Sequence, residues 1–323
     1  MKRRTILASA SAIALAFSGT LVPTMAQDKY PNRPVNVIVP LTPGITLDVL
    51  ARLYAEKMTK ILGQPVVVIN RPGAGGIVGA QSVASALPDG YNLLMTNSGH
   101  VILPVLNKSL PFDPLKDFRG VSLVADAPAV VYVNANLGVK NLQEFIALAK
   151  SKPGTLNFGS AGIGSPTHIA GAYFAQQAGI ILTHVPYKMS ADIVSDLLGD
   201  RIQAVFAPPA YLPTMVKDGR LKALAISSIG DLREPFAAAS ARSQGVDYIT
   251  TTWYGLVAPS KTPPAIVDAL AKAMKQVSED PEVKSKLQLQ GLTANTLALG
   301  EFDAYMKKDS DRLTPLIKAT DTN

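Results

Sequence analysis

The chain has 323 residues, of which 47% are hydrophobic and 17% charged, with a net charge of +7 and no cysteine. The lack of cysteine excludes disulfides, thiolate metal sites, a cysteine nucleophile and a lipid-modified N-terminal cysteine. The basic residues are scattered rather than clustered with aromatics, so the sequence does not indicate nucleic-acid binding. A chain of this length can bury a large core and suggests two domains.

The first 26 residues have the pattern of a secretory signal peptide. Lys2, Arg3 and Arg4 precede an apolar run over 6–22, and a small-residue cleavage site ends at Ala26. Serine, glycine and threonine interrupt the apolar run, so it is too polar to span a membrane. We therefore predict a soluble periplasmic protein without a lipid anchor, and leave open whether Arg3 and Arg4 direct twin-arginine export. Its mature net charge of +4 favours small anions.

Short β-rich runs then alternate with helical patterns. Buried strands are predicted over 35–40, 66–70 and 92–98, with helices over 46–62 and 77–87 between them. A second set follows, with helices over 141–151, 166–178 and 190–198 and strands over 156–160, 181–187, 202–207 and 221–227. Two such sets predict two parallel-rich sheets.

Two extended stretches, 121–134 and 248–259, are predicted to be crossings between domains, and helices over 264–278 and 301–318 end the chain. The predicted fold is therefore an α/β protein with two lobes, one made of 27–125 plus 252–323 and the other of 126–251. Ligands of open α/β sheets lie beyond the carboxyl ends of the strands. The loops there are 41–48, 71–76, 99–100, 161–168, 188–190 and 208–209.

The loop GSAGIGSPTH, residues 159–168, raises the possibility of a serine nucleophile. A nucleophile elbow requires Gly-x-Ser-x-Gly, but Phe158 stands where the first glycine is needed. Ser165 before Pro166 is typical of a helix N-cap. A periplasmic serine hydrolase that uses Ser160 or Ser165 with His168 remains the alternative to a binding protein.

Nucleotide and metal sites are less well supported. The glycine-rich segment 73–79 follows a strand, but the acid expected about 20 residues later would be Asp89, which lies in a Pro-Asp-Gly turn. We therefore interpret Gly73–Gly76 as a tight turn. The three histidines His100, His168 and His184 lack metal-binding spacing. We predict no metal and no cofactor.

Anion binding is the chemistry that fits both lobes. Ser160, Gly162 and Gly164 lead into a helix start at Pro166, which offers backbone N–H groups and the positive end of a helix dipole. Segment 40–46 offers the same before the helix over 46–62. Two such helix starts across a cleft suit a ligand with two anionic ends.

Motifs along nearly the whole mature chain resemble the Bug family, the periplasmic receptors of tripartite tricarboxylate transporters. They include YPxRP at 30–34, LGQPVVV at 62–68, NRPGAGG at 70–76, PDGY at 88–91, GSPTH at 164–168, VPYK at 185–188, GRLKALA at 219–225 and WYGLxAP at 253–259.

The resemblance implies a monomeric, two-lobed binding protein of the Venus-flytrap type (type II-like), without catalytic activity or cofactor, that delivers an organic carboxylate to a membrane permease. Together with the strand-end rule it places the ligand contacts on both lobes. They are Thr42, Gly44, Ile45, Thr46, Asp48, Ser98, His100, Ser160, Ala161, Gly162, Ile163, Gly164, Thr167, His168, Tyr187, Lys188 and Pro208.

Two departures from the family pattern bear on the ligand. Ile45 and Met189 stand where the family usually has glycine, and Pro208 adds a surface without donors. If Ile45 faces the ligand, the site is partly apolar and favours an aromatic acid or a medium-chain dicarboxylate over malate, citrate or glutamate. The alternative is that Ile45 packs against its own lobe and leaves the site polar.

Overall fold

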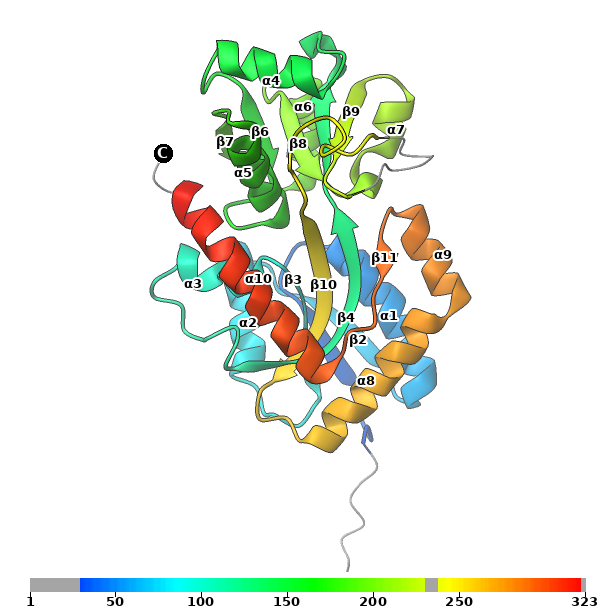
Figure 1. Ribbon diagram of the computed structural model, residues 1–323. Coiled ribbons are helices and arrows are strands. Elements are labelled where there is room, and N and C mark those ends of the chain that lie inside the picture. Colours follow the sequence, from blue (N-terminus) through cyan, green and yellow to red (C-terminus); the bar gives the residue numbers. More distant parts are fainter. Residues whose placement is uncertain (1–29, 230–237, 321–323) are drawn as a thin grey trace, which may run out of the picture.

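The computed structural model describes residues 30–229 and 238–320, so the predicted signal peptide lies outside the described residues. Two sheets form two lobes, one above the other in Figure 1. The lower sheet has the order β11-β4-β10-β3-β1-β2 and the upper sheet the order β7-β6-β8-β5-β9. The strands are β1 Val35–Val39, β2 Val66–Asn70, β3 Asn92–Asn97, β4 Phe118–Pro128, β5 Val130–Asn134, β6 Asn157–Ser160, β7 Thr183–Pro186, β8 Ala204–Ala207, β9 Leu221–Ile226, β10 Thr251–Pro259 and β11 Thr293–Ala294.

Both sheets are mixed, which corrects the prediction of parallel-rich sheets. In the lower sheet β1 pairs in parallel with β2 and β3, whereas β10 runs antiparallel to β3 and β4. In the upper sheet β6 pairs in parallel with β7 and β8, whereas β5 runs antiparallel to β8 and β9. The strand that enters each sheet from the other lobe causes much of the difference, because β10 in the lower sheet and β5 in the upper sheet run opposite to their neighbours.

Helices cover both faces of each sheet. The lower lobe has α1 Thr46–Leu62, α2 Ile77–Ala84, α3 Leu103–Leu106, α8 Pro264–Glu279, α9 Pro281–Leu289 and α10 Leu299–Thr320; the upper lobe has α4 Leu142–Ser151, α5 Pro166–Ala178, α6 Ser190–Leu198 and α7 Pro213–Lys217. Short 3-10 turns are η1 Ala74–Gly76, η2 His100–Ile102, η3 Ala135–Leu137 and η4 Pro209–Tyr211. Within the described part of the chain, every helix is too short or too polar to cross a membrane.

The predicted helix starts and stops are confirmed where they depend on local chemistry. Gly63 ends α1 with a left-handed φ of 69°, and its N–H bonds the Thr59 carbonyl. Ser165 caps α5 by accepting the His168 N–H. Gly73 and Gly76 adopt φ of 147° and 102°, which confirms the interpretation of this segment as a tight turn.

Alternating side chains of the strands build the core on both sides of each sheet. In β1, Val35, Val37 and Val39 belong to the cluster with α1 and α8, whereas Ile38 belongs to the cluster with α2 and α10. In β5, Val131 and Val133 pack with α4 and α5, whereas Val130 and Tyr132 pack with α6. Each lobe therefore has three layers, with a sheet between two sets of helices.

The chain crosses between the lobes twice, as predicted. Only Ala129 separates β4 in the lower sheet from β5 in the upper sheet. The second crossing leads from β9 to β10. Ser227 joins the two crossings, because its hydroxyl accepts the Ala129 N–H at 2.8 Å and its N–H bonds the Ala129 carbonyl at 2.9 Å. Ser227 also donates its hydroxyl to the Thr250 carbonyl.

The lobes meet where backbone approaches backbone. A methyl group at Gly99, after β3, would lie 2.9 Å from the Gly164 carbonyl oxygen of the upper lobe. A methyl group at Gly164 would lie 2.0 Å from the Leu106 side chain of the lower lobe. At Gly99 the obstacle is a backbone oxygen, so glycine permits this close approach; at Gly164 the nearest atom is the end of the Leu106 side chain, and the φ of 77° favours glycine. Of the proposed lobe boundaries, the one after 125 falls within β4 and the one after 251 follows the first residue of β10.

A glycine in α5 tests the packing of the upper lobe. A methyl group at Gly171 would lie 2.4 Å from the Phe158 ring, whereas one at Gly300 in α10 would meet nothing within 4 Å. We expect Gly171→Ala to lower the free energy of unfolding by about 1–3 kcal/mol because it overpacks the core. Gly300→Ala, the matched control, should leave the free energy unchanged or raise it by up to about 1 kcal/mol. Urea denaturation measures both, and equal values would contradict this description of the core.

Candidate ligand-binding site

The carboxyl ends of the parallel strands of both sheets lie at the junction of the lobes. The lower lobe contributes the loop 40–45 between β1 and α1 and the loop 98–99 after β3. The upper lobe contributes the loop 161–165 between β6 and α5 and the segment 187–189 between β7 and α6. The contact of Gly99 with Gly164 shows that two of these loops touch.

Asp48 organises the loop between β1 and α1 instead of facing a ligand with a free carboxylate. Its carboxylate accepts the Gly44 N–H at 2.9 Å, the Arg52 Nε–H at 3.0 Å and the Asn70 side-chain N–H at 2.9 Å. Asn70 also donates to the Leu41 carbonyl at 3.2 Å, and its oxygen accepts from Arg52 at 2.9 Å. These bonds fix the loop from both ends.

This network lowers the pKa of Asp48 although the side chain is only 3% exposed. Burial, the largest single effect, raises the pKa. The hydrogen bonds from Arg52, Gly44 and Asn70 and the charge of Arg52 together outweigh it. Sequence reasoning did not select Arg52 and Asn70, although the spacing of four residues between Asp48 and Arg52 on a helix indicates such a pair.

The start of α1 has no side-chain cap. Ile45 is the N-cap residue, and its side chain offers no acceptor to the first-turn N–H groups. That side chain packs against the core cluster of the lower lobe, so the structure supports the alternative in which Ile45 turns into its own lobe. Thr46 hydrogen-bonds the buried Tyr254 hydroxyl, while Gly44 is exposed with a φ of 86° and Thr42 is half-buried.

Most backbone N–H groups of the loop between β6 and α5 already donate hydrogen bonds to side chains of the same lobe. This corrects the prediction that they are open to an anion. Ala161 N–H bonds the Thr167 hydroxyl at 3.0 Å, Gly162 N–H the Ser160 hydroxyl at 3.1 Å, and Gly164 N–H the Nδ1 atom of His168 at 3.1 Å. The Ile163 N–H has no partner among the described residues, and the Ile163 side chain is 57% exposed. Ile163 is therefore the point at which this loop is open.

Ser160 does not pair with His168. Its hydroxyl lies 2.6 Å from Nε2 of His184, a residue of β7, and its side chain is fully buried. Ser165 caps α5 and shares a hydrogen bond of 3.0 Å with Thr167. Ser160 is therefore buried against His184, and Ser165 serves as the cap of α5.

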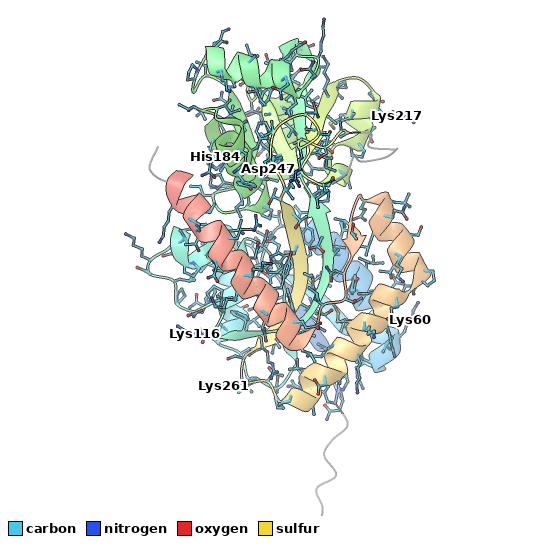
Figure 2. All side chains as sticks on the ribbon, viewed as in Figure 1. Lys60, Lys116, His184, Lys217, Asp247 and Lys261 are labelled. Atoms are coloured by element: carbon cyan, nitrogen blue, oxygen red, sulfur yellow. The ribbon has the colours of Figure 1, made fainter. Side chains whose placement is uncertain are left out.

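His168 and His184 form a stacked pair beneath this loop, with ring centroids 4.0 Å apart. Phe158 stacks on His184 at 4.9 Å. Burial, and then the neighbouring His168, lower the pKa of His184 to about 4. Figure 2 shows His184 in the upper lobe, above the end of α10. No sequence pattern indicated the role of His184, because it lies within the edge strand β7, before the carboxyl end of that strand.

The segment between β7 and α6 presents a cation and an uncapped helix. Lys188 is exposed and forms no ion pair with a residue in the described ranges. Met189, 59% exposed, is the N-cap of α6 and offers no acceptor. The Tyr187 hydroxyl points away, because it bonds Asp196 at 2.8 Å. Pro208 is half-buried, and its carbonyl accepts the Tyr211 N–H at 2.9 Å.

The structure places His100 in the core, which corrects its selection as a ligand contact. Its ring is 4% exposed, packs edge-on to Phe118 at 4.9 Å and stacks on Phe112 at 6.1 Å. Burial lowers its pKa to about 4. Ser98 is buried as well, with its N–H bonded to the Trp253 carbonyl at 3.2 Å. The short turn η2 carries His100 back into the lobe immediately after the strand end.

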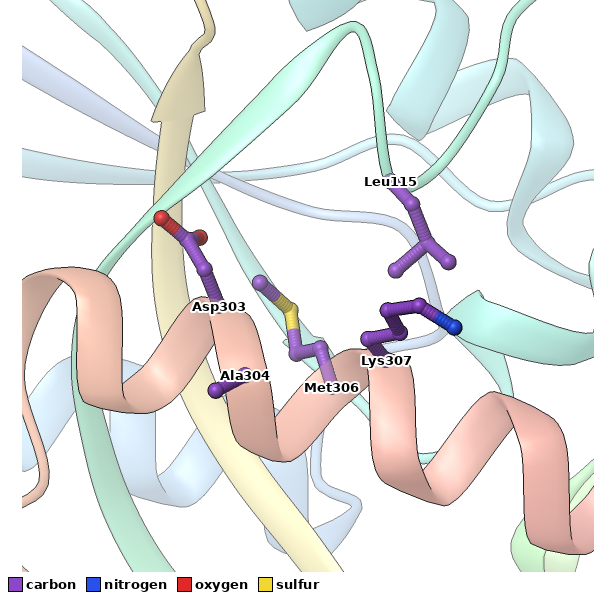
Figure 3. Close-up of a pocket in the computed structure, with 5 residues that line it drawn as sticks. All are labelled: Leu115, Asp303, Ala304, Met306 and Lys307. Atoms are coloured by element: carbon purple, nitrogen blue, oxygen red, sulfur yellow. The ribbon is translucent and has the colours of Figure 1, made fainter.

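A hollow of about 290 Å³ lies elsewhere, on α10 (Figure 3). Its lining residues are Leu115, Asp303, Ala304, Met306 and Lys307. Asp303 already accepts the Gly120 N–H at 2.6 Å, so this hollow has no convergent set of free polar groups. Within 30–229 and 238–320 no three histidine or acidic side chains are grouped to hold a metal ion.

The two α/β lobes and two crossings define a periplasmic binding protein. A family model for the tripartite tricarboxylate transporter family receptor matches residues 50–322, and the chain belongs to this family. The resemblance to the Bug family is thereby confirmed. The chain is 29% identical to the periplasmic binding protein BugD, whose solved structure superposes with a TM-score of 0.81 and covers 90% of this chain and 98% of that one.

Two similar solved structures contain carboxylates. Rpa4515 of R. palustris with adipate is 27% identical, with a TM-score of 0.84 over 90% of this chain and 97% of that one. MatC from Rhodopseudomonas palustris with bound malate is 26% identical, with a TM-score of 0.80 over 89% of this chain and 100% of that one.

The Asp48 network yields a stability prediction. Asp48→Asn removes the charge that three donors bond, so we expect the free energy of unfolding at pH 7 to fall by about 1.5–3 kcal/mol. Because folding lowers the pKa of Asp48, its contribution is present at neutral pH and is lost as the pH falls below about 4. The difference between wild type and variant should therefore shrink at pH 3 in urea denaturation.

Glu56→Gln is the control for this prediction. Glu56 lies 3.6 Å from Lys60, and both side chains are mostly exposed, so its loss should cost less than about 1 kcal/mol. An effect of Asp48→Asn no larger than that of Glu56→Gln would show that the network does not hold the loop.

Proposed function

We propose that this protein is a periplasmic receptor that binds an organic carboxylate between its lobes and delivers it to the membrane permease of a tripartite tricarboxylate transporter. Membership of the receptor family supports the transport role. The binding of adipate and malate by two similar proteins supports a carboxylate as the ligand.

The uncapped start of α1 is the observation that carries the proposal. α1 has 17 residues, and its N-cap is Ile45, a residue that cannot accept a hydrogen bond with its side chain. Its first-turn N–H groups and its dipole attract an anion at the junction of the lobes. In α4, α5 and α9, by contrast, the N-cap side chain accepts a backbone N–H.

The upper lobe offers the second set of donors. Lys188 supplies a positive charge, α6 begins without a side-chain cap, and the Ile163 N–H has no partner among the residues that the structure describes. A dicarboxylate fits this arrangement, with one carboxylate at α1 and the other near Lys188. The proposed contacts are Thr42, Gly44, Ile45, Thr46, Ala161, Ile163, Thr167, Lys188 and Pro208, with Asp48, Ser160, Gly162, Gly164, His168 and Tyr187 shaping the loops around them.

The carbon chain of the ligand is proposed to contact apolar side chains. Ile163 and Met189 are both more than half exposed and lie on the two loops of the upper lobe. Their side chains favour methylene or aromatic groups over hydroxyl or ammonium groups. Because Ile45 packs into its own lobe, the proposed preference for an apolar ligand body depends on Ile163 and Met189 of the upper lobe.

A thermal-shift screen tests the ligand class. We expect adipate, benzoate or terephthalate to stabilise the protein more than malate, citrate or glutamate at equal concentration. At 100 times its dissociation constant a ligand adds about 2.7 kcal/mol to the free energy of unfolding. Calorimetry then gives the affinities. Tighter binding of malate, citrate or glutamate would contradict the apolar contacts, and no response to any carboxylate would contradict the proposed function.

Ile45→Asp tests the role of α1. The new carboxylate should cap the first-turn N–H groups and repel an anion, so we expect the affinity for adipate to fall at least tenfold. The new cap should stabilise the helix by about 1 kcal/mol, and the loss of the Ile45 packing should destabilise the fold. Because the two effects oppose each other, the free energy of unfolding should change little. Pro263→Asp is the matched control, because Pro263 is the exposed N-cap of α8 and also lacks a side-chain cap. Unchanged affinity in Ile45→Asp would show that the anion binds elsewhere.

A further inference from the structure

The loop between β6 and α5 is held from beneath by two imidazoles from different elements. His168, in the first turn of α5, accepts the Gly164 N–H through Nδ1 at 3.1 Å. His184, in β7, reaches the Ser160 hydroxyl through Nε2 at 2.6 Å, and Ser160 in turn bonds both the N–H and the carbonyl of Gly162 at 3.1 Å. The two glycines that flank Ile163 are therefore each bonded, directly or through Ser160, to one histidine.

The hydrogen bond to His168 defines the protonation state that the loop requires. An N–H group donates to Nδ1, so Nδ1 carries a lone pair and the ring is neutral with its proton on Nε2. A second proton would go to Nδ1 and convert this acceptor into a donor, which breaks the bond to Gly164. The stacked His184 opposes the same step, because two charged rings 4.0 Å apart repel each other.

Within 30–229 and 238–320, the elements around the pair carry the following titratable side chains. β6 and β8 have no titratable side chain, and α5 adds only Tyr173 to His168. Asp192 and Asp196 belong to α6, on the opposite face of the sheet, where Asp196 pairs with Arg201. On α10, whose end lies beside α5, Asp309 pairs with Arg312, and Asp311 and Lys318 are exposed. Glu144 and Lys150 of α4 are also exposed.

We propose that His168 and His184 are positioning residues that, as a neutral stacked pair, hold the loop around Ile163 in the form that binds the carboxylate. This proposal rests on the proposed function. It assigns both histidines a role through Gly164 and Ser160, without contact with the ligand. Burial, and then the neighbouring His168, lower the pKa of His184 to about 4, so the His184 ring stays neutral in mildly acidic surroundings.

Substitutions that keep or remove the acceptor separate this role from general packing. His168→Asn can still accept the Gly164 N–H, and we expect its dissociation constant for adipate at pH 7.5 to stay within threefold of wild type. His168→Leu and His184→Leu remove the bonds to the loop and should weaken binding at least tenfold. His100→Leu, in the core of the lower lobe, is the control and should bind like wild type. Circular dichroism establishes that each variant is folded.

The pH profile is the second measurement. The double variant His168→Asn, His184→Gln has no titratable ring in the pair, and comparing it with wild type at each pH cancels the titration of adipate itself. Because the pKa of His184 is lowered to about 4, the ratio of their dissociation constants should be constant from pH 8 to 6 and shift against wild type only as the pH approaches 4.

The outcomes distinguish the two proposals. If folded His168→Leu binds adipate like wild type, or if the ratio shifts between pH 8 and 6, the positioning role is wrong while the receptor function stands. If wild type binds none of the carboxylates in the screen at pH 7.5, the proposed function fails and the positioning role with it.

Discussion

The close approach of Gly99 and Gly164 is the contact on which the junction of the lobes depends. A side chain at Gly99 would meet the Gly164 carbonyl oxygen at 2.9 Å, so glycine at this position lets the two backbones approach. Gly164 has a φ of 77°, a conformation that glycine adopts without strain. The same residue donates its N–H to His168, so contact between the lobes and the shape of the loop are set at one point.

Two kinds of helix start occur in the described part of the molecule, those with a side-chain cap and those without one. Where Ser165 or Asn141 is the N-cap, a side chain satisfies a first-turn N–H and the helix end is complete within the protein. Where Ile45 or Met189 is the N-cap, the N-cap side chain provides no acceptor. The two departures from the usual glycines of the family fall on these uncapped ends, which leaves the donors to solvent or to an anion.

Much of the fold could be predicted from the sequence because its signals are local. The bounds of α1, α5 and α6 follow from apolar spacing and from caps such as Gly63 and Ser165, and both crossings were recognised as extended runs. The short α9 and β11 were missed, because a nine-residue helix and a two-residue strand carry little periodicity. The mixed sheets could not be predicted, since strand direction depends on how the crossings enter.

The sequence indicated which loops make up the candidate site, but it did not indicate the hydrogen-bond partners of the individual groups in them. Strand ends identified the segments around Ile45, Gly164 and Lys188. The Gly162 N–H bonds the Ser160 hydroxyl, and the Gly164 N–H bonds His168. Ser160 in turn bonds His184, which is 24 residues away along the chain. Such tertiary partners leave no spacing pattern. The burial of His100 likewise depends on tertiary partners, because its ring packs against Phe112 and Phe118.

Ser227 has a mechanical consequence for the two lobes. Ser227 lies on the second crossing and forms hydrogen bonds with Ala129 on the first crossing. It also bonds Thr250, at the other end of the second crossing. The two crossings are therefore held side by side where the chain passes between the sheets. A rotation that bends one crossing must bend the other by the same amount about a shared line. Relative movement of the lobes is thereby reduced towards a single degree of freedom, an opening angle, and sliding or twisting of one lobe over the other would require these bonds to break.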